Sequence, residues 1–260
     1  MTKIIAVANH KGGVGKTTTS LNLAHAFAAK RQTTVLLCDL DPQASLSKLL
    51  AINTQAPPLT LYDLLIPQGA IVPVRPEHAI RVTSMAGVSI IPASGQLANV
   101  ETQLVSKLNR ERTLRRVLRP IAESFSFILL DCPPSLNLLT MNALAAANEV
   151  LIPVASEYLA LQALQDFLDT VEEVRAELNP DLKIAGILVT QHQSQTGHAK
   201  GILDALRQTF SDLIFNSVIP YSVRAKDSVA AAQSILTYDP KSVLAKAYRG
   251  LAQELTQAHV

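Results

Sequence analysis

The feature that most constrains the fold is an apolar run that passes without a break into a glycine-rich loop. Residues Lys3–Asn9 have the pattern of a buried strand, glycines crowd the next residues up to Gly15, and a helical pattern begins at Lys16. From there on, short apolar runs alternate with helical patterns, which is the arrangement that buries a parallel sheet between layers of helices. The sequence therefore predicts one α/β domain over residues 1–260, with a mostly parallel, twisted sheet of seven or eight strands flanked by helices.

The expected elements follow from where the period of the pattern changes. Residues 51–87 are the least regular part, and we expect an irregular surface excursion there that carries one short helix at Thr60–Leu65. The predicted strands are Lys3–Asn9, Thr33–Cys38, Val88–Pro92, Phe127–Asp131, Val150–Val154, Ile184–Val189 and Ile214–Ile219. The predicted longer helices cover residues 16–30, 97–119, 136–147, 160–178, 199–210, 225–235 and 241–257.

The composition agrees with a globular domain and excludes several other classes. With 48% hydrophobic residues among 260, the chain can build a core, so disorder and collagen-like repetition are excluded. The first residues lack the pattern of a signal peptide, and no apolar run is long enough to cross a membrane. Cys38 and Cys132 lie in apolar runs, which favours reduced thiols, so we expect a cytoplasmic protein.

The glycine-rich loop has the residues of a phosphate site. Glycines let successive backbone N–H groups converge on phosphate oxygens, and the helix that follows adds its positive end. Lys16 would neutralise phosphate charge, and the Thr17 hydroxyl would bind Mg²⁺. The strict pattern G-x-x-x-x-G-K-[ST] fails because His10 occupies the first glycine position, and Lys11 opens the loop instead. The expected nucleotide contacts here are Lys11, Gly12, Gly13, Val14, Gly15, Lys16, Thr17 and Thr18.

Two further carboxylates follow predicted strands. Asp41 comes shortly after the second strand, and Asp131 ends the fourth. Ligands of open α/β sheets bind at the carboxyl ends of the strands, where carboxylates can hold Mg²⁺ and orient a water molecule. An aspartate at a strand end is also a common turn former or helix cap. Because the phosphate loop lies at the same edge of the predicted sheet, the functional interpretation is favoured.

These motifs together resemble a known family. The loop K-G-G-V-G-K-T at residues 11–17 resembles the deviant Walker A box of the ParA/MinD superfamily of P-loop NTPases. Residues 39–43 resemble the D-x-D-P-Q motif of the ParA family, and residues 131–135 resemble the D-x-P-P-S motif that closes its Walker B strand. The resemblance runs from residue 3 to about residue 257 and is weakest between 50 and 90.

The resemblance implies an ATPase that uses ATP and Mg²⁺ and forms a nucleotide-sandwich homodimer. Lys11 would reach the partner's phosphates, Asp41 would orient the hydrolytic water and touch the Mg²⁺ shell, and Asp131 would support Mg²⁺ through water. Asp39 is assigned mainly to local structure. The expected catalytic residues are therefore Lys11, Lys16 and Asp41, and the expected metal-binding residues are Thr17, Asp41 and Asp131.

The chain looks like the compact, Soj-like branch of the family. Since the phosphate loop begins at residue 11, we expect no helix-turn-helix domain before it. The resemblance implies that the ATP dimer binds double-stranded DNA without sequence preference, associates with the nucleoid, and is released when a ParB-like or cargo adaptor protein stimulates slow hydrolysis. Basic residues exceed acidic ones after residue 183, and the candidate DNA contacts are Arg207, Arg224, Lys226, Lys241, Lys246 and Arg249.

The chain also departs from the family pattern. In the family's adenine motif I-P-x-N, Pro220 matches but Ser222 replaces the asparagine, and we expect both residues to contact the base. Gln195 stands where the family has an arginine that would serve DNA. The arginine-rich stretch 110–119 fits a solvated helix face, with a partner or DNA contact as the other interpretation.

Two other functions fit parts of the sequence. The main alternative is a MinD-like positioning ATPase on a membrane surface, because the predicted helix 241–257 is amphipathic. We expect that helix to dock on its own sheet, since residues 256–260 lack the bulky apolar and basic groups that hold a helix on lipid. The other is a metabolic P-loop ligase or an iron–sulfur reductase relative, which is disfavoured by the missing cluster cysteines and by the D-x-D-P-Q match.

Overall fold

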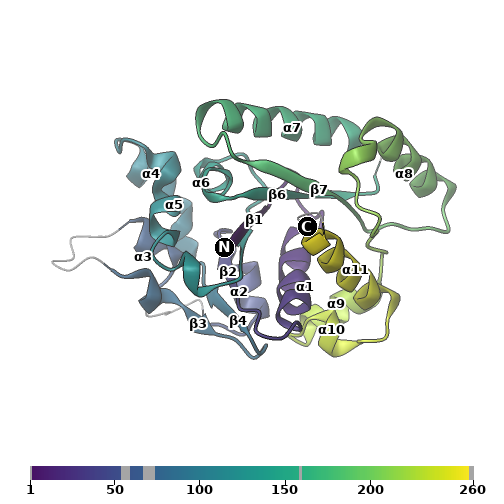
Figure 1. Cartoon of the computed structure of the whole chain (residues 1–260), viewed down its shortest axis with the longest axis horizontal. Coiled ribbons are helices and arrows are strands. Elements are labelled where there is room, and N and C mark those ends of the chain that lie inside the picture. Colours follow the sequence, from purple (N-terminus) through teal and green to yellow (C-terminus); the bar gives the residue numbers. More distant parts are fainter. Residues whose placement is uncertain (1, 54–58, 67–73, 158–159, 258–260) are drawn as a thin grey trace.

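A seven-stranded sheet crosses the domain, with the strand order β3-β4-β2-β5-β1-β6-β7 (Figure 1). The computed structural model describes residues 2–53, 59–66, 74–157 and 160–257. All neighbouring strands are parallel except β3 and β4, which are antiparallel. The strands are β1 (Lys3–Val7), β2 (Val35–Asp39), β3 (Arg81–Val82), β4 (Val88–Ile91), β5 (Phe127–Asp131), β6 (Glu149–Ala155) and β7 (Lys183–Thr190).

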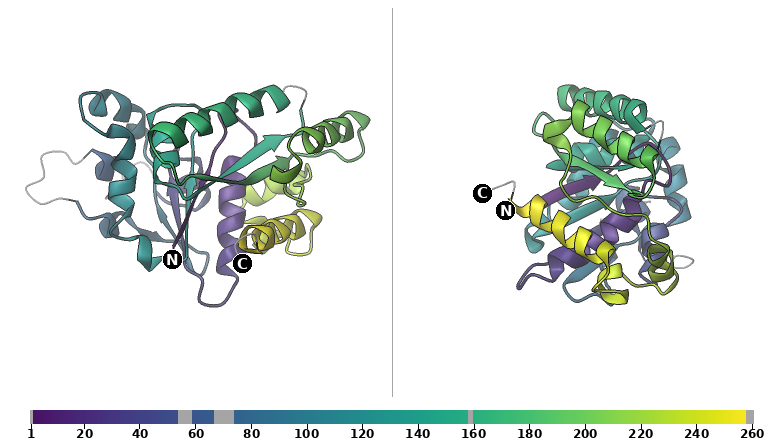
Figure 2. Two further views of the ribbon diagram at one scale, coloured as in Figure 1. Left: turned by 45° about the horizontal axis from the view of Figure 1, so that its top comes forward. Right: turned by 90° about the vertical axis from the view of Figure 1, so that its right-hand side faces the viewer.

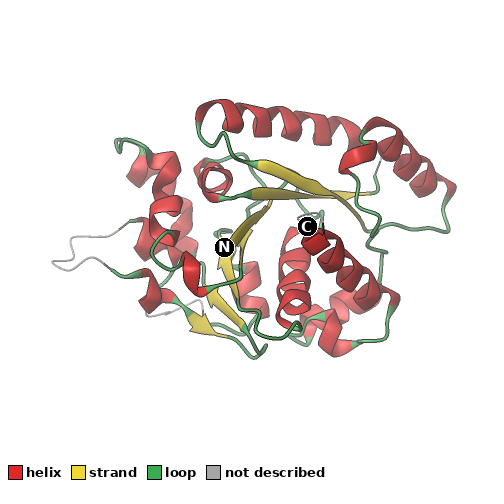
Figure 3. Cartoon of the chain, viewed as in Figure 1, coloured by secondary structure: helices red, strands yellow, loops and turns green. Residues whose placement is uncertain are grey.

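Helices cover both faces of the sheet (Figures 2 and 3). One layer holds α1 (Lys16–Ala28), α2 (Ser45–Leu49), α10 (Ile235–Tyr238) and α11 (Val243–Gln257), with α9 (Val223–Ala230) beside α10. The other layer holds α3 (Leu61–Leu65), α4 (Val100–Leu104), α5 (Thr113–Leu118), α6 (Leu138–Ala146), α7 (Ala160–Glu177) and α8 (Gly197–Thr209). Short 3₁₀ turns are η1 (Pro76–Ala79), η2 (Gly95–Asn99), η3 (Arg110–Arg112), η4 (Ala122–Ser124) and η5 (Ser211–Leu213).

The alternation of side chains along the central strands produces two cores. In β1, Ile5 and Val7 pack on the α1 and α11 side, whereas Ala6 packs on the α6 and α7 side. In β5, Leu129 and Leu130 divide in the same way. Since both faces of a parallel sheet are buried, the strands are apolar throughout, as the sequence pattern indicated.

Six predicted strands are confirmed to within a residue or two, but the seventh is wrong. Residues Ile214–Ile219 run beside β7 and form one isolated bridge with it, between Ile214 and Ile187. Two of their backbone N–H groups donate to β7, whereas those of Asn216 and Ser217 donate to the Glu254 carboxylate of α11 at 2.7 and 2.8 Å. A side chain thus takes the donors that an eighth strand would need.

Two predicted helices are wrong as single elements. The predicted helix 97–119 divides into η2, α4, η3 and α5, because Asn109 has a left-handed backbone with φ 55° that no helix can pass through. Leu108 beside it is 88% exposed. The predicted helix 225–235 divides into α9 and α10 at Ala232, which has φ 52°. The other predicted helices match α1, α3, α6, α7, α8 and α11.

The irregular segment 51–87 is partly described. Its expected short helix is α3, which begins with a capping box between Thr60 and Asp63. The antiparallel edge strand β3, which the sequence did not indicate, also belongs to it. Residues 54–58 and 67–73 of this segment lie outside the described residues.

Gly186 shows how closely the segment after α8 approaches the sheet. It follows a register irregularity between β6 and β7 and has φ 150°. A Cβ atom at this position would lie 2.6 Å from the ring of Phe215 and 3.0 Å from the carbonyl oxygen of Leu213. Only a residue without a side chain fits this position.

We therefore predict that Gly186→Ala lowers the free energy of unfolding by about 1–3 kcal/mol, the usual cost of overpacking. The control is Gly201→Ala on α8, where nothing lies within 4 Å of the added Cβ and alanine favours the helix by up to about 1 kcal/mol. Urea unfolding followed by circular dichroism measures both variants. A Gly186→Ala protein as stable as the parent would contradict the close approach.

Candidate functional site

The glycine-rich loop joins β1 to α1 at the carboxyl edge of the central strands. Gly13 and Gly15 have φ 75° and 87°, the left-handed region that glycine adopts without strain. Gly15 is the N-cap of α1, and no side chain caps the helix there. The loop thus turns tightly while the first N–H groups of the helix stay available to an anion.

Side chains at or just after the ends of neighbouring strands hold the loop in place. The Thr190 hydroxyl at the end of β7 donates to the carbonyl of Val14 at 2.8 Å, and the Gln191 amide donates to the carbonyl of Gly13. The Asn9 amide donates to the carbonyl of Pro153 in β6 at 2.8 Å. These anchors were not predicted, because their partners are backbone atoms far away in the sequence.

Lys16 folds back into the loop. Its Nζ donates to the carbonyl of Lys11 at 2.8 Å, and the residue is only 7% exposed. Burial lowers the pKa of this amine, while the negative charges of Asp131 and Asp41 act in the opposite direction. The ammonium therefore lies inside the loop, where bound phosphates would need a counter-charge.

The buried carboxylate of Asp131 has an oxygen available for a metal or a water molecule. Ser20 donates to its Oδ1 at 3.0 Å, whereas its buried Oδ2 has no hydrogen-bond partner among the described residues. Burial raises the pKa of Asp131, as does the neighbouring Asp39, while the Thr17 and Ser20 hydroxyls favour the charged form. A nearby cation would offset the cost of burying this charge.

These oxygen donors fit Mg²⁺. The ion prefers hard oxygen ligands and usually keeps several waters together with phosphate oxygens, so it needs few protein groups. The hydroxyl of Thr17 and the carboxylate of Asp131 interact with one another at the loop. No group of three or more His, Cys, Asp or Glu residues in the described part of the chain forms a candidate metal cluster. A site completed by phosphate and water is consistent with both observations.

Asp39 and Asp41 have different surroundings. Asp39 accepts hydrogen bonds from the Ser47 N–H and hydroxyl at 2.9 and 2.7 Å and from the Asp41 N–H at 3.1 Å. Burial raises the pKa of Asp39 to about 6, although these hydrogen bonds act to lower it. The structure thus gives Asp39 the local role expected of it. Asp41 is half-exposed and accepts a hydrogen bond from the Gln43 N–H at 2.9 Å. Its negative charge acts to raise the pKa of Lys16.

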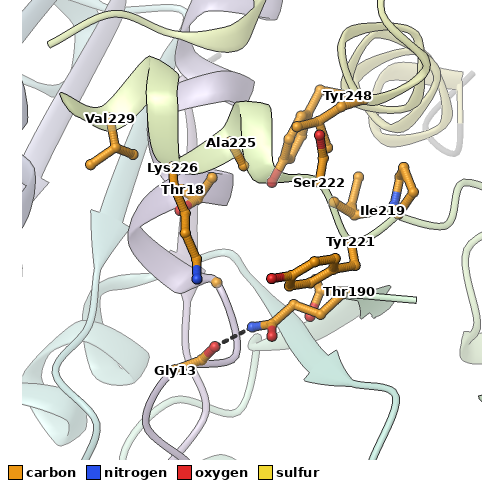
Figure 4. Close-up of a pocket in the computed structure, with 14 residues that line it drawn as sticks. Gly13, Thr18, Thr190, Ile219, Tyr221, Ser222, Ala225, Lys226, Val229 and Tyr248 are labelled. Atoms are coloured by element: carbon orange, nitrogen blue, oxygen red, sulfur yellow. Dashed lines mark hydrogen bonds between the residues drawn. The ribbon is translucent and has the colours of Figure 1, made fainter. Parts of the chain in front are cut away.

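A cavity of about 400 Å³ connects the loop with the segment after β7, which is the size range of ligand pockets (Figure 4). Gly13, Gly15 and Thr18 line the phosphate side. Pro220 and Ser222, the predicted base contacts, line the other side. The structure therefore brings together in one cavity the two groups of residues that the sequence assigned separately to nucleotide binding.

Nine residues of the cavity wall were not predicted as nucleotide contacts, and four of them have long side chains that carry a polar group. Tyr248 is buried on α11, Tyr221 is 46% exposed between Pro220 and Ser222, and Gln191 follows β7. The fourth, Lys226, was predicted as a DNA contact, yet it lines this cavity from α9. The helical spacing from Ser222 to Lys226 is a signal in the sequence that could have placed them on one face.

The other candidate DNA contacts do not form one surface. Arg224 pairs with Asp239 at 3.3 Å, and Arg249 donates to the carbonyl of Pro240 at 2.7 Å, so both lie around the start of α11. Lys241 and Lys246 are exposed in the same region. Arg207 is exposed on α8, in the helix layer on the other face of the sheet.

The amphipathic helix α11 docks on its own domain, as expected. Its apolar side chains Leu244, Tyr248, Leu251 and Leu255 are buried in the core that it shares with α1. Residues 258–260 lie outside the described part of the chain. None of the described helices is both long enough and apolar enough to cross a membrane.

The strand, the glycine loop and the helix, with buried carboxylates at the same level, define a P-loop nucleotide-binding protein. A family described as an AAA domain matches residues 2–184. The chain is 40% identical over 257 residues to the sporulation initiation inhibitor protein Soj of Bacillus subtilis, with 98% of both proteins covered. It is 39% identical over 253 residues to the chromosome partitioning protein ParA of Myxococcus xanthus, covering 97% of this chain and 87% of that protein. The chain belongs to the ParA/Soj family of P-loop ATPases.

A solved structure of similar fold comes from Mycobacterium smegmatis. It is described as cobyrinic acid a,c-diamide synthase with a bound ATP analogue and magnesium. The TM-score is 0.85 at 34% identity, covering 99% of this chain and 95% of that one. The expected fold class, a P-loop α/β domain with a mostly parallel sheet, is therefore confirmed.

Lys16→Ala is predicted to lower the affinity for a non-hydrolysable ATP analogue with Mg²⁺ by about 30-fold or more, because a buried charge partner of the phosphates is lost. Calorimetry measures the affinity, and circular dichroism checks the fold. Lys30→Ala is the matched control, since Lys30 is exposed after α1 and donates to the Thr256 hydroxyl, away from the loop. Equal affinities in the parent and in Lys16→Ala would refute the phosphate-loop assignment.

Proposed function

We propose that this protein is an ATP-driven partitioning switch. ATP and Mg²⁺ bind at the loop and drive formation of a homodimer, the dimer binds double-stranded DNA without sequence preference, and hydrolysis releases it. A ParB-like or cargo adaptor protein stimulates this slow hydrolysis. The protein works in the cytoplasm and associates with the nucleoid in its ATP state.

The observation that carries the proposal is the opposite orientation of two lysines in one loop. Lys16 points into the loop and donates to the carbonyl of Lys11. Lys11 points outward, where its partly exposed ammonium pairs with the exposed carboxylate of Glu157 in the same chain. One lysine therefore serves the phosphates of its own subunit, and the other is accessible to a second copy of the chain.

The residues around the loop support slow hydrolysis by positioning. Mg²⁺, when bound, supplies charge neutralisation at the β- and γ-phosphate oxygens. Thr17 and Asp131 would hold the metal shell, Lys16 would neutralise phosphate charge, and Asp41 would orient the attacking water. Rate acceleration then rests on orientation and charge, which a partner can improve.

A membrane-surface role receives no support from a specific observation. The apolar face of α11, which such a role would need, is buried against α1 among the described residues. We therefore propose that the dimer binds DNA and not a membrane surface.

We predict that Lys11→Ala keeps the affinity for ATP but loses ATP-induced dimerisation, because the side chain acts across the subunit interface. Calorimetry measures binding, and gel filtration with light scattering measures the oligomeric state. Glu157→Gln is the matched control, since it breaks the same ion pair and leaves Lys11 in place. Dimerisation lost in both variants would show that the pair acts within the subunit and would remove the sandwich model.

For DNA, we predict ATP-dependent binding that falls steeply with salt, with a logarithmic slope of about −0.9 for each phosphate neutralised. Fluorescence anisotropy on two unrelated duplexes should give equal affinities, because we expect no element that reads base edges. Arg224→Glu should weaken binding to both duplexes and flatten the slope, while dimerisation persists.

The control for this DNA experiment is Arg31→Glu, which makes the same charge change at an exposed arginine that was not a candidate DNA contact. Absence of ATP-dependent binding at low salt would count against DNA as the surface. A preference for one duplex would reveal a recognition element.

A further inference from the structure

Helix α9 brings an ammonium group into the wall of the nucleotide cavity. Lys226 lines the cavity together with Gly13, Gly15 and Thr18, although they lie at opposite ends of the sequence. Figure 4 shows its side chain running from α9 toward the loop, with the nitrogen at the loop end. Lys226 therefore lies where the phosphate part of the cavity meets the base part.

The charge of Lys226 is uncompensated within the cavity. Every other residue that lines the cavity is uncharged, and all of them belong to the described part of the chain. Asp239, which follows α10, is paired with Arg224. No salt bridge of Lys226 occurs among the described residues. A cation that faces a ligand-sized cavity without an acidic partner favours an anionic ligand.

The position of Lys226 distinguishes it from the other two lysines of the site. Lys16 lies inside the loop, bonded to the carbonyl of Lys11, and Lys11 points away to Glu157. Lys226 approaches from the side of Tyr221, whose hydroxyl faces it across the cavity in Figure 4. This side leads to the predicted base contacts, so the phosphate it meets is the one next to the ribose.

We propose that Lys226 binds the phosphate nearest the ribose of the bound nucleotide and is a third lysine of the nucleotide site. The proposal rests on the nucleotide site of the proposed function and reassigns a residue that the sequence had placed on the DNA surface. It also means that mono-, di- and triphosphates all gain from Lys226, because all three carry this phosphate.

The test is a series of adenosine, AMP, ADP and a non-hydrolysable ATP analogue, titrated with Mg²⁺ by calorimetry. In Lys226→Gln, the affinities for AMP, ADP and the ATP analogue should fall by a similar factor of about ten, the loss of one charge-assisted hydrogen bond. The affinity for adenosine should not change. Lys200→Gln is the matched control, since Lys200 is an exposed lysine of α8 that does not line the cavity and was not a candidate DNA contact.

Three results would overturn the assignment. Unchanged affinities for all four compounds mean that Lys226 does not touch the nucleotide. A loss that includes adenosine places the contact on the base or the ribose. Weaker DNA binding at saturating nucleotide, with unchanged nucleotide affinities, returns Lys226 to the DNA surface.

The same titrations separate this inference from the proposed function. A parent protein that shows the expected series but neither dimerises nor binds DNA would support the role of Lys226 and contradict the switch. A parent protein that binds none of the nucleotides would overturn both.

Discussion

The central parallel strands β1, β2 and β5 end side by side at the same edge of the sheet, and the rest of the candidate site depends on this. In the register of the sheet, Asp131 of β5 lies beside Val7 of β1 and beside Asp39 of β2. Two buried carboxylates are therefore neighbours just where the phosphate loop starts. Burial raises the pKa of both, and the charge of Asp39 raises the pKa of Asp131 further. Hydrogen bonds from Ser47 and Ser20 lower this cost, and the ammonium of Lys16 lies close by. A domain that buries like charges in this way is prepared for a cation.

The sequence predicted the parts of the fold that depend on local pattern. The apolar strands, the loop and the local role of Asp39 could be found because each is encoded by adjacent residues. The false strand Ile214–Ile219 could not be recognised, since its backbone donors are taken by Glu254, which comes much later in the chain. The break at Asn109 depends on one left-handed residue in an otherwise helical pattern.

The loop of the candidate site could be picked out of the sequence for the same reason. The phosphate residues follow one another in the chain, so their spacing carries the chemistry. The wall of the cavity is assembled from the end of β7 and from the helices α9 and α11. Thr190, Lys226 and Tyr248 of these elements come together at the loop only after folding. Their contribution depends on distance in space, and a single sequence gives no direct measure of it.

Two hydrogen bonds between Glu254 and the segment after α8 link the last helix to the side of the cavity that Pro220 lines. Glu254 holds the backbone of Asn216 and Ser217, the chain then continues to Pro220, and Tyr248 of the same helix lines the cavity. A shift of α11 would therefore move Tyr248 and, through two hydrogen bonds, the segment that leads to Pro220. The C-terminal helix is thus mechanically coupled to one wall of the cavity.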